Sequence, residues 1–158
     1  MFKKTPITLK IFACILGFSI FLDIITLGRL QISTEYKLFN YYKLDYLFIA
    51  LQIIHLATST ATIFAILKKT KEAYLFAWSS ISVGLLNATI SGFLMLSNTD
   101  IAKKLYIAHR IALKASVEEN FVNFIFSPTG LLISTVFGLF YFGFLAYLIQ
   151  NNRHFLDN

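Results

Sequence analysis

The sequence predicts an all-α integral membrane protein: a four-transmembrane-helix bundle with an amphipathic interfacial helix between the third and fourth spans. Of its 158 residues, 57% are hydrophobic and only 14% are charged, and the mean hydropathy is +0.69. A soluble domain carries about a quarter charged residues and exposes more surface than this composition could cover with charge. The composition therefore excludes a soluble globular enzyme and a disordered chain.

The charged residues are spaced so that they leave four long apolar stretches. Three stretches lack Asp, Glu, Lys and Arg altogether, and a fourth holds a single Asp: residues 46–67, 73–99, 120–152 and 11–28. A helix needs about 20 predominantly apolar residues to cross the hydrocarbon core, and backbone within lipid must be hydrogen-bonded internally. We therefore expect one membrane domain (residues 1–158) with four transmembrane helices: 9–30, 46–67, 73–96 and 128–150.

The first expected span follows a basic N-terminus, as in a secretory signal peptide, but we expect it to be retained. No small-x-small cleavage site follows its apolar run. Only 12 residues of that run (11–22) precede Asp23, too few to span, so Asp23 must lie in or near the hydrocarbon. A carboxylate there costs about 2.5–3.5 kcal/mol. Asp23 is therefore either a protonatable site of a transporter or channel, or a buried carboxyl that fixes helix pairing.

Polar residues of the second expected span share one helical face: Gln52, His55, Ser59 and Thr62. This polar stripe either packs against a neighbouring helix, as polar side chains commonly do in membranes, or lines a pathway for protons or a small solute. The expected partner of Asp23 is His55, Asn87 or a hydroxyl residue.

Small residues recur at every fourth position of the third expected span: Ser80, Gly84, Ala88 and Gly92. This pattern lets two helix backbones approach closely, and the partner is another helix of this chain or of a second copy. Asn87 lies near the middle of the same span and is a further candidate for a polar pathway.

The charged segment that follows is too polar for a fifth span and predicts an amphipathic helix over residues 100–117. Lys103, Arg110 and Lys114 share one face, and apolar residues such as Ile101 and Leu105 share the other. We expect this basic face to contact lipid headgroups, although the same pattern would bind an acidic partner.

Ser127 and Pro128 predict the start of the fourth span, since serine caps helices and proline is favoured in the first turn. Small residues again recur at every fourth position: Gly130, Ser134 and Gly138. The apolar residues 121–126 are either an interfacial or partly re-entrant segment, or the first part of one longer helix that is kinked at Pro128.

Four crossings place both termini on one side of the membrane, and the positive charges do not decide which side. Each side would carry seven Lys and Arg residues. The short basic loop at residues 68–71 and the lysines ahead of the first span favour cytoplasmic termini in the plasma (inner) membrane.

The sequence contains no motif for catalysis, metal binding or nucleotide binding. Its single cysteine, Cys14, and its three scattered histidines offer no metal-ligand spacing. We expect no enzyme activity and no cofactor. We also expect no nucleic-acid binding, because the basic residues behind the net charge of +6 mostly flank the expected spans.

Two classes of function lead, of which the sequence favours the first; an enzyme acting on lipid is a third and weaker alternative. The first is a bundle that acts through contacts in the lipid bilayer, with another membrane protein or with itself as a homo-oligomer, in an accessory, assembly or immunity-type role. The small-residue stripes support it. The second is an oligomeric transporter or channel protomer for a small solute, ion or proton, with a pathway of six residues: Asp23, Gln52, His55, Ser59, Thr62 and Asn87. The first predicts a dry packing seam along the polar stripe, and the second predicts a continuous polar cavity.

Overall fold

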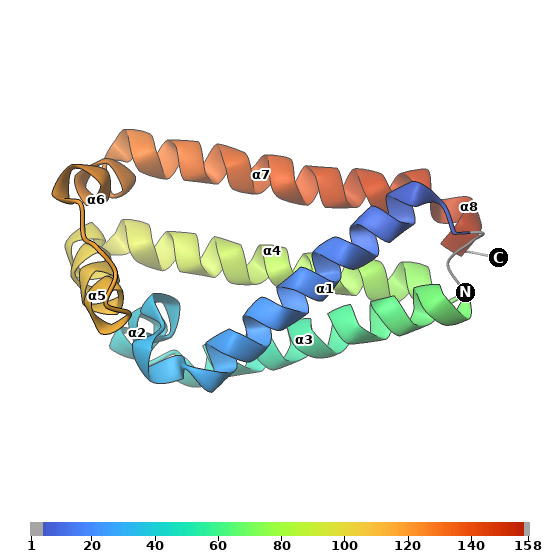
Figure 1. Cartoon of the computed structure of the whole chain (residues 1–158), viewed down its shortest axis with the longest axis horizontal. Coiled ribbons are helices and arrows are strands. Elements are labelled where there is room, and N and C mark those ends of the chain that lie inside the picture. The colour runs from blue at the N-terminus through green and yellow to red at the C-terminus, as the bar shows by residue number, and fades with distance from the viewer. Residues whose placement is uncertain (1–4, 157–158) are drawn as a thin grey trace.

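The structure is a computed structural model that describes residues 5–156. Within this range the chain is helical and has no β-strand, and four helices are long and apolar enough to cross a membrane (Figure 1). These are α1 (Ile7–Gly28), α3 (Asp45–Lys68), α4 (Ala73–Ser97) and α7 (Pro128–Asn151). Their ends differ by at most two residues from those of the expected spans.

Five shorter helices complete the chain: η2 (Leu30–Ile32), α2 (Thr34–Tyr41), α5 (Thr99–Ala112), α6 (Glu119–Ile125) and α8 (Arg153–Leu156). The amphipathic helix expected over residues 100–117 ends earlier. Lys114 adopts a left-handed φ of 53°, and the N–H of Ala115 bonds to the carbonyl of Arg110 at 2.9 Å, which closes α5 in a Schellman motif. Apolar periodicity does not predict η2 or α2, because both are short.

Local sequence accounts for the start of α7. Ser127 Oγ accepts a hydrogen bond of 3.1 Å from the N–H of Gly130, and Pro128 occupies the first turn. The preceding residues form the separate helix α6, so the chain breaks before Pro128 instead of continuing as one kinked helix. Gly130 is buried in this break, where a Cβ would lie 2.1 Å from the carbonyl oxygen of Phe124.

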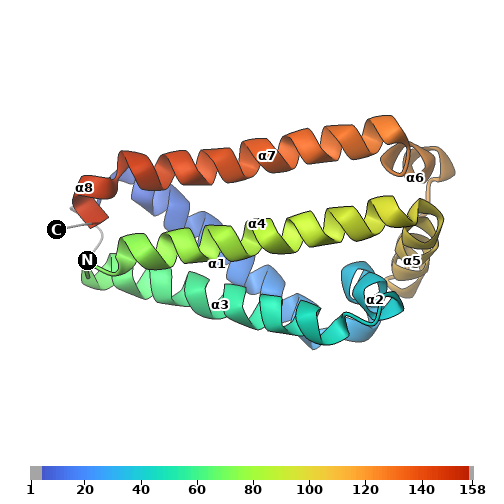
Figure 2. The same ribbon diagram turned by 180° about the vertical axis from the view of Figure 1, so that it is seen from behind.

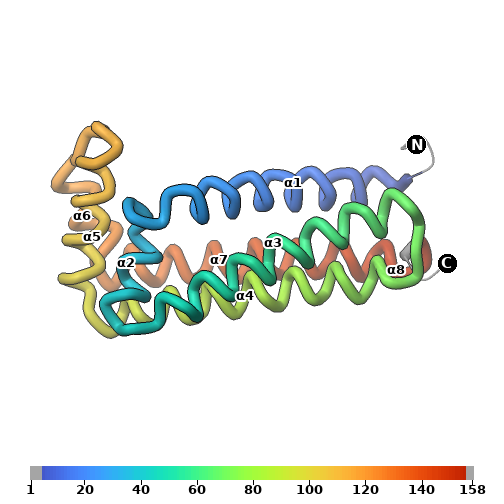
Figure 3. Tube along the Cα trace, turned by 90° about the horizontal axis from the view of Figure 1, so that it is seen from below, coloured from blue at the N-terminus to red at the C-terminus, as the bar shows by residue number. Residues whose placement is uncertain are grey.

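The four long helices form a bundle in which they do not pack equally closely. α3 and α4 form an antiparallel hairpin, α1 crosses this hairpin diagonally, and α7 runs alongside α4 (Figures 1 and 3). The first and last described residues lie at one end of the molecule with the α3–α4 turn, which we call the terminal end. The helices α2, α5 and α6 gather at the opposite, distal end (Figure 2).

Two separate clusters of buried apolar side chains hold the helices together. The cluster at the terminal end joins α1, α3, α4 and α7 and includes Leu9, Phe12, Ile66, Ala77, Leu145 and Ile149. The distal cluster joins α2, α3, α4 and α5 and includes Leu38, Phe39, Phe48, Leu94 and Ala102. Because α7 contributes only to the first cluster, its N-terminal half is not tied to the bundle by a buried apolar core.

The outward faces of the long helices expose many large apolar side chains, among them Phe18, Leu75, Phe93, Leu132, Phe137 and Phe140. Contiguous apolar surface of this extent is unfavourable in water and marks a surface that contacts lipid or protein. The exposed apolar side chains and the length and hydropathy of the four helices lead to the same conclusion, that this is a membrane-embedded protein.

Candidate functional site

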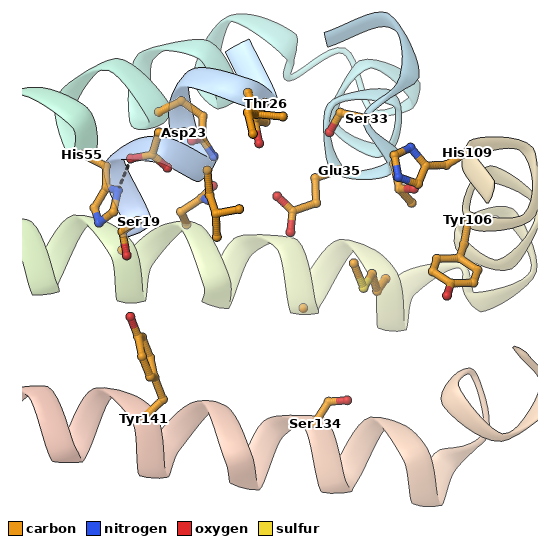
Figure 4. A pocket seen from close by; sticks show the side chains of 18 of the residues that line it. Ser19, Asp23, Thr26, Ser33, Glu35, His55, Tyr106, His109, Ser134 and Tyr141 are labelled. Atoms are coloured by element: carbon orange, nitrogen blue, oxygen red, sulfur yellow. Dashed lines mark hydrogen bonds and ion pairs between the residues drawn. The ribbon is translucent and has the colours of Figure 1, made fainter. Parts of the chain in front are cut away.

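The candidate site is centred on a hydrogen-bonded pair of ionisable side chains between α1 and α3, which we call the ion pair. Asp23 lies in the last third of α1 and His55 near the middle of α3, and their side chains meet where the two helices cross (Figure 4). Nδ1 of His55 is 2.7 Å from Oδ2 of Asp23, and the two side chains are only 19% and 12% exposed. Their hydrogen bond offsets part of the cost of burying both groups.

The ring of His55 fits because α4 presents a glycine to it. A Cβ on Gly84 would lie 3.3 Å from Nε2 of His55 and 3.3 Å from the ring of Phe142. Toward the terminal end, the buried hydroxyls of Ser59 and Ser80 share a hydrogen bond of 2.7 Å that joins α3 to α4. The Ser59–Ser80 bond thus joins α3 to α4 on the terminal side of the ion pair, and an open space extends from the pair toward the distal end.

That space is a cavity of about 930 Å³ between α1, α3, α4 and α7, which we call the interior cavity. Asp23 and His55 line it near its inner end, and Ser134 and Tyr141 point into it from α7 (Figure 4). Because Ser134 and Tyr141 are also exposed at the surface, the cavity opens along α7. Its volume falls within the range of about 300–1,000 Å³ that is typical of ligand-binding pockets.

Two buried carbonyl oxygens in the cavity wall lack a hydrogen-bond donor. Within the described residues, neither Oε1 of Gln52 nor Oδ1 of Asn87 has a partner, and both residues line the interior cavity. Gln52 precedes His55 by one turn of α3, and Asn87 follows Gly84 by one turn of α4, so both lie on the distal side of the ion pair. A buried unpaired polar group costs about 1–3 kcal/mol, which a donating ligand would offset.

A second carboxyl, that of Glu35 on α2, faces the interior cavity near the distal end (Figure 4). Burial raises the pKa of Glu35, and the nearby Asp23 raises it further. Arg29 and His109 line the same part of the cavity. The ring of His109 hydrogen-bonds through Nδ1 to the carbonyl of Ile32, which ties α5 to η2.

The raised pKa of Glu35 makes stability dependent on pH. The folded protein binds this proton more tightly than the unfolded chain, so the stabilisation is complete below the ordinary pKa of 4.5 and is lost as pH rises through the folded-state pKa. Each tenfold difference in proton affinity corresponds to about 1.4 kcal/mol. Glu35→Gln cannot ionise, so we expect it to match the wild type at acid pH and to be more stable at alkaline pH.

Melting temperatures of both proteins in detergent, from about pH 4 to about pH 9, measure this effect. Melting temperatures that change in parallel with pH would contradict it, because Glu35 would then titrate alike in the folded and unfolded chains.

The polar stripe of the second expected span divides into two parts. Gln52 and His55 line the interior cavity together with Asp23 and Asn87. Ser59 and Thr62 are fully buried and do not line the cavity; Thr62 donates a hydrogen bond of 2.7 Å to the carbonyl of Thr58 in its own helix. The stripe thus lines the cavity at Gln52 and His55 and is buried between packed helices at Ser59 and Thr62.

The small residues of α4 do not form a continuous seam between helices of this chain. Ser80 bonds to α3, and Gly84 accommodates His55. Ala88 is exposed, whereas Gly92 lines the interior cavity, and a Cβ on Gly92 would have no neighbouring atom within 4 Å. Within one chain, this stripe therefore serves close approach only in its first half.

The small residues of α7 have three different surroundings. Gly130 is packed against the end of α6, and Ser134 lines the interior cavity while its Oγ bonds to the carbonyl of Gly130 at 3.0 Å. Apart from α7 itself, the described residues place no atom within 4 Å of the Cβ position of Gly138. No helix of the described chain packs closely along this stripe.

The amphipathic helix α5 lies across the distal end with its apolar face in the distal cluster. Lys103 donates from Nζ to Oδ1 of Asn123 at 2.5 Å, and Arg110 donates from Nη2 to the carbonyl of Ser116 at 2.8 Å. Lys114 is exposed. Two of the three basic side chains predicted to contact headgroups therefore also connect α5 to the segment that follows it.

The sequence pattern does not single out Glu35, Arg29 or His109 as site residues. For Glu35 a local signal exists: Ser33 caps α2 by accepting a hydrogen bond of 3.3 Å from the N–H of Tyr36, and an acidic residue in the first turn is typical of a helix start. That signal predicts a short helix but not its position over the interior cavity, which depends on packing against α3 and α5.

Among the described residues, no three His, Cys, Asp or Glu side chains lie close enough together to hold a metal ion. No family model, curated protein or solved structure matches this chain. The geometry and chemistry of the interior cavity are therefore the features that bear on function.

Proposed function

We propose that this chain crosses the bilayer as a four-helix bundle and binds a small solute in the interior cavity, as a transporter or channel protomer. The observation that carries the proposal is the Asp23–His55 ion pair at the inner end of an open cavity. Ionisable residues inside a membrane are costly and usually belong to a binding site or a proton pathway. A pair that only joined two helices would have no need of a cavity beside it.

Further polar side chains line the interior cavity between the ion pair and the distal end. Gln52, Asn87 and Glu35 line the interior cavity in that direction, so a polar solute or a proton has successive partners along it. Because the cavity is open along α7, a second copy placed there would enclose it. This supports a homo-oligomer as the transporting unit.

The proposed orientation has both termini in the cytoplasm and the plasma (inner) membrane as the location. The lysines of the α3–α4 turn, at residues 68, 69 and 71, then lie on the cytoplasmic side. The distal end faces the opposite side, and the interior cavity extends to it at Glu35, Tyr106 and His109. In this orientation Lys103, Arg110 and Lys114 lie at the level of the headgroups of the outer leaflet.

Thiol labelling of Ser134→Cys, in a Cys14→Ser background, tests this proposal. Ser134 lines the cavity, so we expect a membrane-impermeant maleimide to label the variant in intact cells. The matched control is Phe137→Cys on the same helix: Phe137 is 70% exposed but does not line the cavity, and a thiol facing lipid forms little reactive thiolate.

Labelling of Ser134→Cys in intact cells, with Phe137→Cys unlabelled, is the expected result. Labelling only in inside-out vesicles would support a solute-accessible cavity but would mean that the protein has the opposite orientation in the membrane. Protection of Ser134→Cys on both sides of the membrane would overturn the proposal, because no aqueous solute could then enter the cavity.

A second candidate function is contact with another membrane protein or with a second copy. Two small residues without a packing partner among the described residues favour it: Ala88 is exposed on α4, and no described side chain lies near the Cβ position of Gly138 on α7. Disulfide cross-linking of Ala88→Cys between copies, in the Cys14→Ser background, would place α4 at such an interface.

A further inference from the structure

Unpaired hydrogen-bond acceptors lie one helical turn from His55 on α3 and one turn from Gly84, which faces His55, on α4. Gln52 is only 6% exposed, and its Oε1 has no partner among the described residues. Asn87 is half-buried, and its buried Oδ1 has no partner there either. Asp23 uses Oδ2 to bind His55, which leaves Oδ1 available. Asp23, Gln52 and Asn87, which we call the acceptor cluster, come from α1, α3 and α4 and line one cavity.

The charges around the interior cavity also favour a cationic ligand. Two carboxyls line it, those of Asp23 and Glu35, together with one guanidinium, that of Arg29, which belongs to an exposed residue at the end of α1. Two imidazoles also line it, but that of His55 is bonded to Asp23 and that of His109 to the carbonyl of Ile32. No lysine of the described chain lines the cavity. Because burial raises the pKa of Glu35, Asp23 is the carboxyl that would attract a cation and repel an anion, and both effects are strong in a medium of low dielectric constant.

The rest of the wall is apolar. Ile25, Met95 and Leu131, from α1, α4 and α7, face the same space on the distal side of the acceptor cluster. A ligand that satisfies the cluster with one polar end would therefore place an apolar body against these side chains. Pockets for small molecules typically combine a largely apolar wall with a few convergent polar groups.

We infer that the interior cavity binds a primary ammonium with an apolar body, and that the acceptor cluster holds its charged end. The three N–H donors of a primary ammonium match the three acceptors that Asp23, Gln52 and Asn87 supply. The inference rests on the proposed function and specifies the substrate class of that site. Asp23 supplies the opposite charge, and the two amides orient the ammonium by neutral hydrogen bonds.

Calorimetry with three probes that share one body tests the inference: 4-phenylbutylamine, 4-phenylbutanol and 4-phenylbutyrate. The full chain is studied in nanodiscs of zwitterionic lipid near neutral pH, and empty nanodiscs correct for partitioning into lipid. We expect saturable binding of the amine, about tenfold or more tighter than that of the alcohol, because hydrogen bonds to a charged group are the stronger ones. The butyrate should bind most weakly.

Two glutamine variants assign the effect to the acceptor cluster. Gln52→Met keeps the length of the side chain but removes the unpaired oxygen, so we expect about tenfold weaker amine binding, unchanged alcohol binding and no loss of stability. The matched control is Gln31→Met, since Gln31 is exposed on η2 and does not line the cavity. It should bind all three probes as the wild type does.

Equal binding of amine and alcohol, or tightest binding of the butyrate, would overturn the ammonium class while leaving a solute-binding cavity. Absence of saturable binding for all three probes, with Ser134→Cys labelled, would also overturn the ammonium class alone. Unchanged amine binding by Gln52→Met would remove the acceptor cluster from the site. The proposed function is tested by a different measurement: it would fail if the maleimide did not label Ser134→Cys on either side of the membrane.

Discussion

Gly130→Ala is expected to destabilise the protein by about 1–3 kcal/mol or more, as does overpacking of a rigid site. The added Cβ would lie 2.1 Å from the carbonyl oxygen of Phe124 and 2.8 Å from that of Ile125. Both are backbone atoms at the end of α6, so no side-chain rotation can relieve the clash. Relief requires a shift of α6 relative to α7, near the first turn of α7.

Gly138→Ala provides the matched control on the same helix. No atom lies within 4 Å of its Cβ position, so only the intrinsic preference of alanine for helix remains, and we expect stabilisation of about 0.5–1 kcal/mol. The free energy of unfolding in mixed detergent micelles measures both variants. Equal effects for the two would mean that the α6–α7 corner is loose, and destabilisation by Gly138→Ala alone would indicate a partner on that face of α7.

The four long helices are predictable from the sequence because their cause is local. Charged residues bound each apolar stretch, and Ser127 with Pro128 marks the start of α7 through its own hydrogen bond to Gly130. The segment between α1 and α3 is different. Its helix α2 has only eight residues, and Leu38 and Phe39 are buried by packing against distant helices rather than by an apolar period along the chain.

The candidate site is only partly predictable. Helical periodicity places Gln52 and His55 on one face of α3, and the cost of a carboxylate in lipid singles out Asp23. That His55 is the partner of Asp23 depends on the angle at which α1 crosses α3, which no local pattern encodes. The interior cavity depends equally on α7 being absent from the distal cluster.

The stripe of small residues on α4 illustrates the same limit. Four positions have one spacing in sequence but different surroundings: Ser80 bonds to a neighbouring helix, Gly84 makes room for an imidazole, Ala88 faces outward and Gly92 faces the cavity. The spacing predicts which face of α4 carries small residues. What approaches that face is decided by helices elsewhere in the chain.

Asp23→Asn is expected to fold normally but to bind 4-phenylbutylamine about tenfold or more weakly, because the buried charge that attracts the ammonium is lost. The amide oxygen of asparagine can still accept the hydrogen bond from Nδ1 of His55, which in the wild type spans 2.7 Å. Asp23→Leu has no acceptor. It leaves a largely buried imidazole nitrogen unpaired, so we expect a loss of stability of about 1–3 kcal/mol.

The measurements are the melting temperature in detergent, for folding, and calorimetric titration with the amine and the alcohol, for the site. If Asp23 only ties α1 to α3, asparagine replaces it fully, and the Asn variant binds the amine as the wild type does. If Asp23 supplies the charge of a binding site, the Asn variant keeps the stability of the wild type but binds the amine more weakly. The alcohol distinguishes charge from shape, because asparagine has nearly the size of aspartate and alcohol binding should therefore survive in Asp23→Asn.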